Sequence, residues 1–184
     1  AARLDHSERR YYMRFPSKIS RLTGIAIPVG SLRTATSEGI GDFLDLPSFG
    51  EFAKSCGARL IQLLPVNDTG FQSSPYSALS AFALHPVYVK LSALPEAIGF
   101  EREIAALRDD LDSSARIRYE ETLSRKLVIM RAMYEKNAEA IAAGPEIGAW
   151  ERKNPWIAAY AAYSLLKERN GGKPWHQWAD HRDP

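Results

Sequence analysis

The sequence predicts an α/β fold that begins with a strand–helix–strand unit and continues as helices. Two short apolar runs, residues 24–29 and 59–64, have the length and composition of strands, and residues 45–56 between them have helical spacing. Because both runs are mostly apolar, we expect strands that are buried on both faces, as in a parallel sheet or barrel.

The helix predicted over residues 45–56 has both a start signal and a stop signal. Asp45 supplies a capping carboxylate, with a serine as the alternative cap. Pro47 suits the first turn, and Gly57 lies just past the end. Cys56 falls on the apolar face of this helix, where we expect a buried structural thiol.

A polar loop follows the second strand, which stops at Pro65. The loop combines hydroxyl, amide and carboxylate groups with aromatic rings, supplied by Asn67, Asp68, Thr69, Phe71, Gln72, Ser73, Ser74, Tyr76 and Ser77. Proteins bind sugars with such groups, which hydrogen-bond the hydroxyls and stack on the apolar side of the ring. The same composition also suits a polar surface loop whose tyrosine only packs against the body. Pro75 and the apolar residues 81–84 favour a fixed loop.

Helices are predicted for the rest of the chain. Apolar residues recur at helical intervals over 95–112 and again over 114–143, where Gly144-Pro145 ends the pattern. A last helix starts at Asn154-Pro155 and stops at Gly171-Gly172.

The predicted architecture is incomplete in two respects. The sheet has too few strands to close a barrel, which needs about eight, so we expect the chain to be part of something larger. The aromatic tail over residues 174–178 has no evident partner within the chain.

Composition describes an ordinary folded chain and excludes several classes of function. The 184 residues are 45% apolar and 25% charged, which is typical of a globular domain. A net charge of +2 without a block of like charges argues against a nucleic-acid partner. Because no run of about 18 apolar residues occurs, no membrane span is predicted.

Cysteine content and the N-terminal residues bear on location. The single cysteine cannot form an internal disulfide, which fits a reducing cytoplasm. Residues 1–23 are a basic lead-in without the apolar core of a secretory signal. Asp5 and Glu8 count against an organelle transit peptide, so we expect a cytoplasmic protein, with a plastid as the less favoured location.

Neither a metal site nor a cofactor site is predicted. Of the four histidines, only His176 and His181 are close in sequence, whereas metal sites need three or four converging ligands. The Gly39-Ile40-Gly41 segment lacks the third glycine and the lysine of phosphate-binding loops, so we interpret it as a turn.

Residues 24–91 resemble the opening of the 4-alpha-glucanotransferases, the amylomaltases or disproportionating enzymes of glycoside hydrolase family 77. The segments that carry the resemblance are, in order, Gly24-Ile25-Ala26-Ile27-Pro28-Val29, Ser31-Leu32, Gly39-Ile40-Gly41-Asp42-Phe43, Gln62-Leu63-Leu64-Pro65, Gly70, Ser74-Pro75-Tyr76 and Leu79-Ser80-Ala81-Phe82-Ala83. The family's helical insertion is similar to later parts of this chain, namely Tyr119, Lys126, the helix over 156–166, Trp175 and Trp178.

Three positions depart from the family pattern. Ile61 stands where tryptophan is usual, His85 where asparagine is usual, and Ser37-Glu38 where an aromatic-glycine pair is usual. The departures suggest a divergent branch of the family.

The resemblance implies an alpha-amylase-like (β/α)8 TIM barrel that is incomplete in this chain. Residues 1–23 would be a lead-in, residues 24–94 the first βα units with the Ser-Pro-Tyr loop, and residues 95–184 a helical insertion subdomain. The implied activity is transfer of 1,4-alpha-glucan segments between maltooligosaccharides or to glucose, with retention of configuration, in starch, glycogen or maltodextrin metabolism.

A retaining enzyme of this kind needs two carboxylic acids about 5 Å apart, one of them the nucleophile. In the family these residues lie on later strands, and none of their motifs occurs in this sequence. The acidic pairs Asp109-Asp110 and Glu120-Glu121 are expected on solvated helix faces. We therefore expect no catalytic residue in this chain, no activity from it alone, and a need for the remainder of the same enzyme to complete the barrel.

The resemblance assigns sugar binding to Tyr76, whose family counterpart stacks on the glucose ring next to the scissile bond. Ser74 and Asp68 are close enough in sequence to contribute to the same wall, with a maltooligosaccharide or alpha-glucan as the partner. Trp156 and Tyr160 have two interpretations, an outer glucan-contact surface or core packing. The alternative function is a non-catalytic glucan-binding module that uses the Tyr76 loop without turnover.

Overall fold

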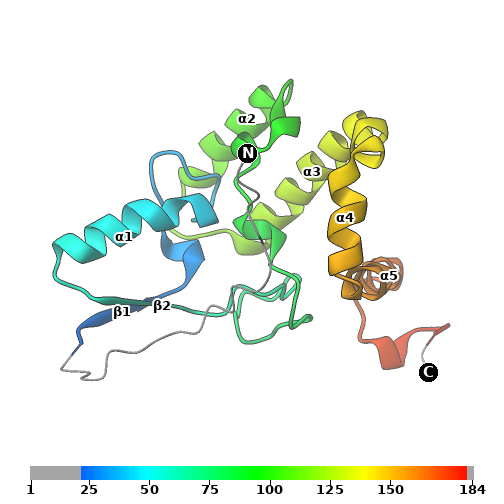
Figure 1. The fold of residues 1–184 in the computed structure, drawn as a ribbon, viewed down its shortest axis with the longest axis horizontal. Helices are drawn as coiled ribbons and strands as arrows, with labels where there is room; N and C mark the ends of the chain where they lie inside the picture. The colour runs from blue at the N-terminus through cyan, green and yellow to red at the C-terminus, as the bar shows by residue number, and fades with distance from the viewer. Residues whose placement is uncertain (1–21, 182–184) are drawn as a thin grey trace, which may run out of the picture.

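The computed structural model describes residues 22–181 (Figure 1). Its strands and helices are β1 (Gly24–Ile27), α1 (Leu46–Ser55), β2 (Leu60–Leu63), α2 (Glu101–Asp112), α3 (Tyr119–Ala143), α4 (Pro145–Lys153) and α5 (Trp156–Arg169). In Figure 1 the two strands and α1 lie at one end of the molecule, and α4 and α5 lie at the other. The strand–helix–strand order and the helices over 101–112, 119–143 and 156–169 confirm the predictions from apolar spacing.

The two strands pair in parallel, in a register that places Gly24 opposite Leu60 and Ile27 opposite Leu63. Within the described residues the sheet consists of these two strands. The prediction that both faces are buried is wrong here, because Leu60 is 54% exposed and Leu63 is 38% exposed. An apolar strand is buried only when other elements cover it, and the described part of the chain leaves both side chains open to solvent.

Helix α1 begins after a reciprocal pair of carboxylate contacts. The N–H of Leu44 donates to Oδ1 of Asp42 (2.8 Å), and the N–H of Asp42 donates to Oδ2 of Asp45 (2.9 Å). Asp45 therefore precedes α1 as predicted. Its side chain, however, accepts from the N–H of Asp42 and makes no hydrogen bond to the first turn of the helix. The prediction of a buried thiol is wrong, since Cys56, directly after α1, is exposed.

In the described part of the chain, two clusters of buried apolar residues form the core, and both include side chains of α3. One joins the loop after β1 to the chain before α2 and contains Val29, Ile40, Val87, Tyr88 and Leu123. The other packs α2 against α3 and contains Leu91, Ala97, Ile104, Leu107, Leu111, Ile129 and Met133. Burying one such leucine contributes about 1.5–3 kcal/mol. Because α3 supplies buried side chains to both clusters, it joins the segments around β1 to α2.

The C-terminal tail folds back on α5, and the expectation that it lacks a partner is wrong. The ring of Trp178 lies 5.7 Å from the ring of Tyr163, and its indole N–H donates to the carbonyl of Lys173 at 2.9 Å. Gly171 and Gly172 have φ values of +65° and +77°, which reverse the chain after α5. Trp178 is consequently only 4% exposed.

Candidate functional site

The polar loop after β2 is closed at its base by backbone hydrogen bonds. Asn67 and Leu84 form an antiparallel bridge, and the N–H of Asp68 donates to the carbonyl of Ala83 at 2.9 Å. The N–H of Leu79 returns to the carbonyl of Asp68 at 2.7 Å. These contacts hold the two arms of the loop together, as the apolar residues 81–84 led us to expect.

Tyr76 and Ser74 lie on one turn at the surface of this loop. The N–H of Ser77 donates to the carbonyl of Ser74 at 3.1 Å and closes the turn around Pro75. Both predicted residues are exposed, and Tyr76 is 73% exposed. The turn thus presents an aromatic face and a hydroxyl to solvent, which is the chemistry needed to bind a sugar ring.

Asp68, the third predicted residue, lies beneath the loop. Its Oδ1 accepts from the N–H of Gly70 at 2.8 Å, and its Oδ2 accepts from the hydroxyl of Tyr160 on α5. Burial, and then the neighbouring carboxylate, raises the pKa of Tyr160, so its hydroxyl keeps the proton that it donates. Both oxygens of Asp68 are therefore engaged inside the chain, and the structure does not bring this residue to the exposed turn.

His85 is a second anchor of the loop, at one of the positions where the sequence departs from the family pattern. Its side chain is 1% exposed, and its Nε2 lies 3.0 Å from the carbonyl oxygen of Gly70 and 2.6 Å from the hydroxyl of Tyr119. Burial lowers the pKa of His85, and the Asp68 carboxylate partly opposes this effect. Sequence reasoning assigned no role to His85, although the unusual histidine before Pro86 was a signal.

A buried ion pair fixes the chain that follows the loop. Lys126 of α3 donates to the carbonyls of Val87 (3.0 Å) and Val89 (2.8 Å), and its Nζ lies 3.7 Å from Oε2 of Glu38. Burial lowers the pKa of Lys126, whereas the carboxylates of Glu38 and Asp42 raise it. Glu38 belongs to the pair that departs from the family pattern, and its structural partner was not predicted.

Aromatic side chains connect α5 to the loop. The rings of Phe82 and Trp156 stack with centroids 5.6 Å apart, and Trp156 also contacts Trp150 and Tyr160 at 6.1 Å each. Trp156 and Tyr160 are half-buried, while Phe82 is 66% exposed and Trp150 is 48% exposed. Trp156 and Tyr160 thus pack α5 against the loop, and the exposed aromatic surface beside them belongs to Phe82 and Trp150.

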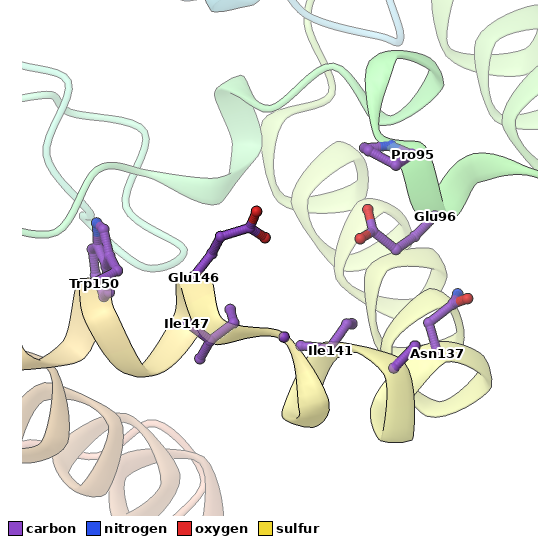
Figure 2. Close-up of a pocket in the computed structure, with 9 residues that line it drawn as sticks. Pro95, Glu96, Asn137, Ile141, Glu146, Ile147 and Trp150 are labelled. Carbon is purple, nitrogen blue, oxygen red and sulfur yellow. The ribbon is translucent and has the colours of Figure 1, made fainter. Parts of the chain in front are cut away.

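A separate open cleft of about 590 Å³ lies between α3, α4 and the turn at residues 95–97. Figure 2 shows Glu96 and Glu146 turning their carboxylates toward each other across this cleft, with Trp150 at one end. Its remaining lining includes Pro95, Asn137, Ile141 and Ile147. None of the three predicted sugar-binding residues lines this cleft, so the exposed turn and the cleft are distinct features.

The acidic pairs considered in the sequence are exposed, as predicted. Asp110 accepts hydrogen bonds from the guanidinium groups of Arg118 and Arg125, which lower the pKa of its carboxyl group. Over residues 22–181, no three histidine, cysteine, aspartate or glutamate side chains converge as metal ligands would. In the same range, no helix combines the length and apolar character that crossing a membrane requires.

Comparisons with known proteins place the chain among the 4-alpha-glucanotransferases. A family model described as 4-alpha-glucanotransferase matches residues 27–184. The chain is 34% identical over 166 residues to the 4-alpha-glucanotransferase DPE2 of Oryza sativa, covering 86% of this chain and 17% of that protein. It is 32% identical over 159 residues to the 4-alpha-glucanotransferase of Chlamydia pneumoniae, covering 84% of this chain and 30% of that protein. The chain therefore spans less than a third of these relatives' lengths.

Two solved structures share the fold at low identity. The amylomaltase of Streptococcus agalactiae, solved in complex with acarbose, aligns with a TM-score of 0.67 at 21% identity, over 88% of this chain and 32% of that one. The amylomaltase of Corynebacterium glutamicum aligns with a TM-score of 0.55 at 24% identity, over 65% of this chain and 19% of that one. Since the family model covers residues 27–184, most of the sequence, the chain belongs to the 4-alpha-glucanotransferase family, glycoside hydrolase family 77.

Proposed function

We propose that this chain supplies part of the sugar-binding wall of a retaining 4-alpha-glucanotransferase. The enzyme would transfer 1,4-alpha-glucan segments between maltooligosaccharides or to glucose, in starch, glycogen or maltodextrin metabolism. The observation that supports this proposal is the exposed ring of Tyr76, held on a closed turn in a member of this family.

The loop suits this role because its backbone is fixed before a ligand arrives. Asp68 is bound by Tyr160 on α5, and His85 is bound by Tyr119 on α3. A loop that is already ordered loses little conformational entropy on binding, which favours the productive position of Tyr76. Ser74 on the same turn supplies a hydroxyl that can hydrogen-bond the sugar. Asp68 would contribute to the wall through its position beneath the loop.

The reacting carboxylates are proposed to lie outside these 184 residues. The two paired strands would be the first strands of a (β/α)8 barrel that the remainder of the enzyme completes, and residues 95–184 would be its helical subdomain. Support comes from the solvent-exposed leucines of β2 and from the small share of each relative that the chain covers. We propose a cytoplasmic location, with a plastid as the less favoured one.

The alternative is a glucan-binding module without turnover. The exposed aromatic surface of Phe82 and Trp150 favours it, because exposed rings are the usual platform for sugars. The two functions differ in what the 184-residue chain does alone: a module binds maltooligosaccharides by itself, whereas part of an enzyme needs the remaining chain.

The test compares Tyr76→Ala with Tyr134→Ala in the full-length protein. Tyr134 is a matched control, since it is 57% exposed and belongs to α3 rather than to the loop. With maltotriose as donor, the products, glucose and longer maltodextrins, are separated and quantified. We expect the Tyr76 variant to lose transfer by about 10- to 100-fold, taking the about 1–3 kcal/mol that a nucleic-acid base gains by stacking on an aromatic side chain as the scale for a sugar ring. The Tyr134 variant should keep transfer. Equal transfer by both variants would contradict the proposal, and transfer by the 184-residue chain alone would contradict the placement of the carboxylates.

A further inference from the structure

His85 occupies a buried position where three backbone or side-chain groups define its protonation. The N–H of Val87 points at Nδ1 from 3.2 Å. On the other side of the ring, Nε2 lies 3.0 Å from the carbonyl oxygen of Gly70 and 2.6 Å from the hydroxyl of Tyr119. Both ring nitrogens are therefore engaged, and the chemistry of their partners can be used to place the proton.

The partners determine a single tautomer. A backbone N–H can only donate, so Nδ1 of His85 accepts from Val87 and carries no proton. A carbonyl can only accept, so Nε2 carries the proton that faces Gly70. Both ends of the ring give the same answer, the neutral Nε2–H form, and Nε2 then cannot accept from Tyr119. The Nε2–H is thus shared between the Gly70 carbonyl and the Tyr119 oxygen.

The direction of the next hydrogen bonds follows from this tautomer. The Tyr119 hydroxyl accepts from His85, so its own proton is available for Oγ1 of Thr69, 3.2 Å away. The hydroxyl of Thr69 in turn lies 2.5 Å from the carbonyl oxygen of Gln72, which can only accept. Each hydroxyl donates once and accepts once, and the chain of hydrogen bonds ends on the loop backbone.

This chain of hydrogen bonds holds the segment that leads to Tyr76. The carbonyls of Gly70 and Gln72 are both fixed from beneath, and the N–H of Gln72 donates to the carbonyl of Thr69 at 3.2 Å. Gly70 adopts a φ of +59°, so the chain bends sharply at this point. The exposed turn containing Ser74 and Tyr76 begins directly after this segment.

We propose that neutral His85, as the Nε2–H tautomer, is a positioning residue that fixes the Tyr76 loop through Tyr119, Thr69 and the carbonyls of Gly70 and Gln72. The proposal rests on the proposed function for the catalytic value of that position, but the hydrogen-bond chain itself does not depend on it. His85 is buried and acts on the sugar only through the loop.

The same geometry makes the chain of hydrogen bonds sensitive to protonation of His85. A second proton would sit on Nδ1, where it would face the N–H of Val87 at 3.2 Å, two donors against each other. The titratable groups around the ring are the Asp68 carboxylate, 3.7 Å from Nε2, and the phenols of Tyr88 and Tyr119, whose ring centroids lie 5.8 and 5.7 Å away. Asp68 favours the charged form, and burial with the Val87 donor opposes it.

The tautomer can be measured directly in the full-length protein by long-range ¹H–¹⁵N NMR of its histidine rings at neutral pH. We expect one ring in the neutral Nε2–H form, with a signal that disappears in His85→Gln and thereby identifies it. An Nδ1–H tautomer or a doubly protonated ring for His85 would overturn the proposal. This result needs no enzymatic activity, so it stands apart from the proposed function.

The positioning role is tested by kcat/KM for transfer from maltotriose. Tyr119→Phe keeps the ring but removes the hydroxyl, and His85→Asn keeps an acceptor for Val87 but removes the Nε2–H. We expect each to lower kcat/KM about three- to tenfold, the effect of losing one buried hydrogen bond. His85→Gln should retain more activity than His85→Asn, because its amide N–H can reach the position of Nε2. Tyr134→Phe, on the same helix, is the control and should leave kcat/KM unchanged.

The double variant His85→Asn/Tyr119→Phe tests whether the two residues act through the same chain of hydrogen bonds or independently of each other. If both residues act in the same chain, the double variant should be about as impaired as the worse single variant. Multiplied losses, or variants equal to the unmodified protein, would overturn the positioning role. If the unmodified protein transfers no glucan, the proposed function fails, while the NMR result still decides the tautomer.

Discussion

The hydroxyl of Tyr160 on α5 donates a hydrogen bond to Oδ2 of Asp68, a residue 92 positions earlier in the chain. The other carboxylate oxygen of Asp68 accepts from the N–H of Gly70, so this side chain joins the polar loop to the last helix. Asp68 is only 9% exposed, so solvent has little access to its carboxylate.

Tyr160→Phe should lower the free energy of unfolding by about 1–3 kcal/mol, because it leaves one buried oxygen of Asp68 without a donor. Tyr163→Phe on the same helix is the matched control. Its ring packs on Trp178, and the substitution keeps that contact. Urea denaturation followed by circular dichroism measures both changes. A loss in the control as large as that in Tyr160→Phe would contradict the assigned role.

Alanine substitutions at Gly39 and Gly57 distinguish the cost of backbone strain from the cost of steric overlap. Both have positive φ values, +85° and +80°, but a Cβ on Gly39 would lie 2.8 Å from Cβ of Leu111, whereas a Cβ on Gly57 would meet nothing within 4 Å. We expect Gly57→Ala to cost about 1–2 kcal/mol from strain alone. Gly39→Ala should cost about 1–3 kcal/mol more because of overpacking. Equal losses in unfolding free energy for the two variants would refute this difference.

The buried pair of Glu38 and Lys126 should respond strongly to removal of either partner. Glu38 also accepts from the N–H groups of Leu91 (2.7 Å) and Ser92 (2.9 Å). Lys126→Met leaves a buried carboxylate without its cation, so we expect a loss of about 3–5 kcal/mol in unfolding free energy.

Glu38→Gln/Lys126→Met is the informative double variant of this pair. It removes both charges at once, and we expect a loss smaller than the sum of the two single losses. Additive losses in urea denaturation would show that the two residues act independently.

His85 should make stability depend on pH below its ordinary pKa of 6.5. Above 6.5 the ring is neutral in both the folded and the unfolded chain. As the pH falls below 6.5, the unfolded chain takes up a proton that the folded chain resists, so stability decreases toward the lowered pKa of the folded state.

The measurement compares unfolding free energies of the unmodified protein and His85→Gln between about pH 8 and about pH 5, the range in which histidine side chains titrate. The difference between the two profiles isolates His85 from the other histidines, and we expect the variant to lose less stability on acidification. Parallel profiles would contradict a lowered pKa for His85.

Local sequence patterns were sufficient to predict the two strands and helices α1, α2, α3 and α5, whereas α4 was not predicted. These features follow from local patterns: apolar spacing for α2, α3 and α5, glycine and proline at their ends, and a Ser-Pro-Tyr turn after a strand. The turn interpretation of Gly39 is confirmed by its φ of +85° for the same reason, since glycine chemistry is local.

Which polar residues face inward depends on how distant segments pack together. Asp68 and Tyr160, His85 and Tyr119, and Glu38 and Lys126 are each brought together across long stretches of chain, 34 residues for His85 and Tyr119 and 92 for Asp68 and Tyr160. No local pattern marks such pairs, because their geometry exists only after α3 and α5 pack against the loop. The β2 leucines and Cys56 were predicted to be buried because they are apolar. Burial also requires neighbouring elements that cover the side chain, and apolar character alone does not supply them.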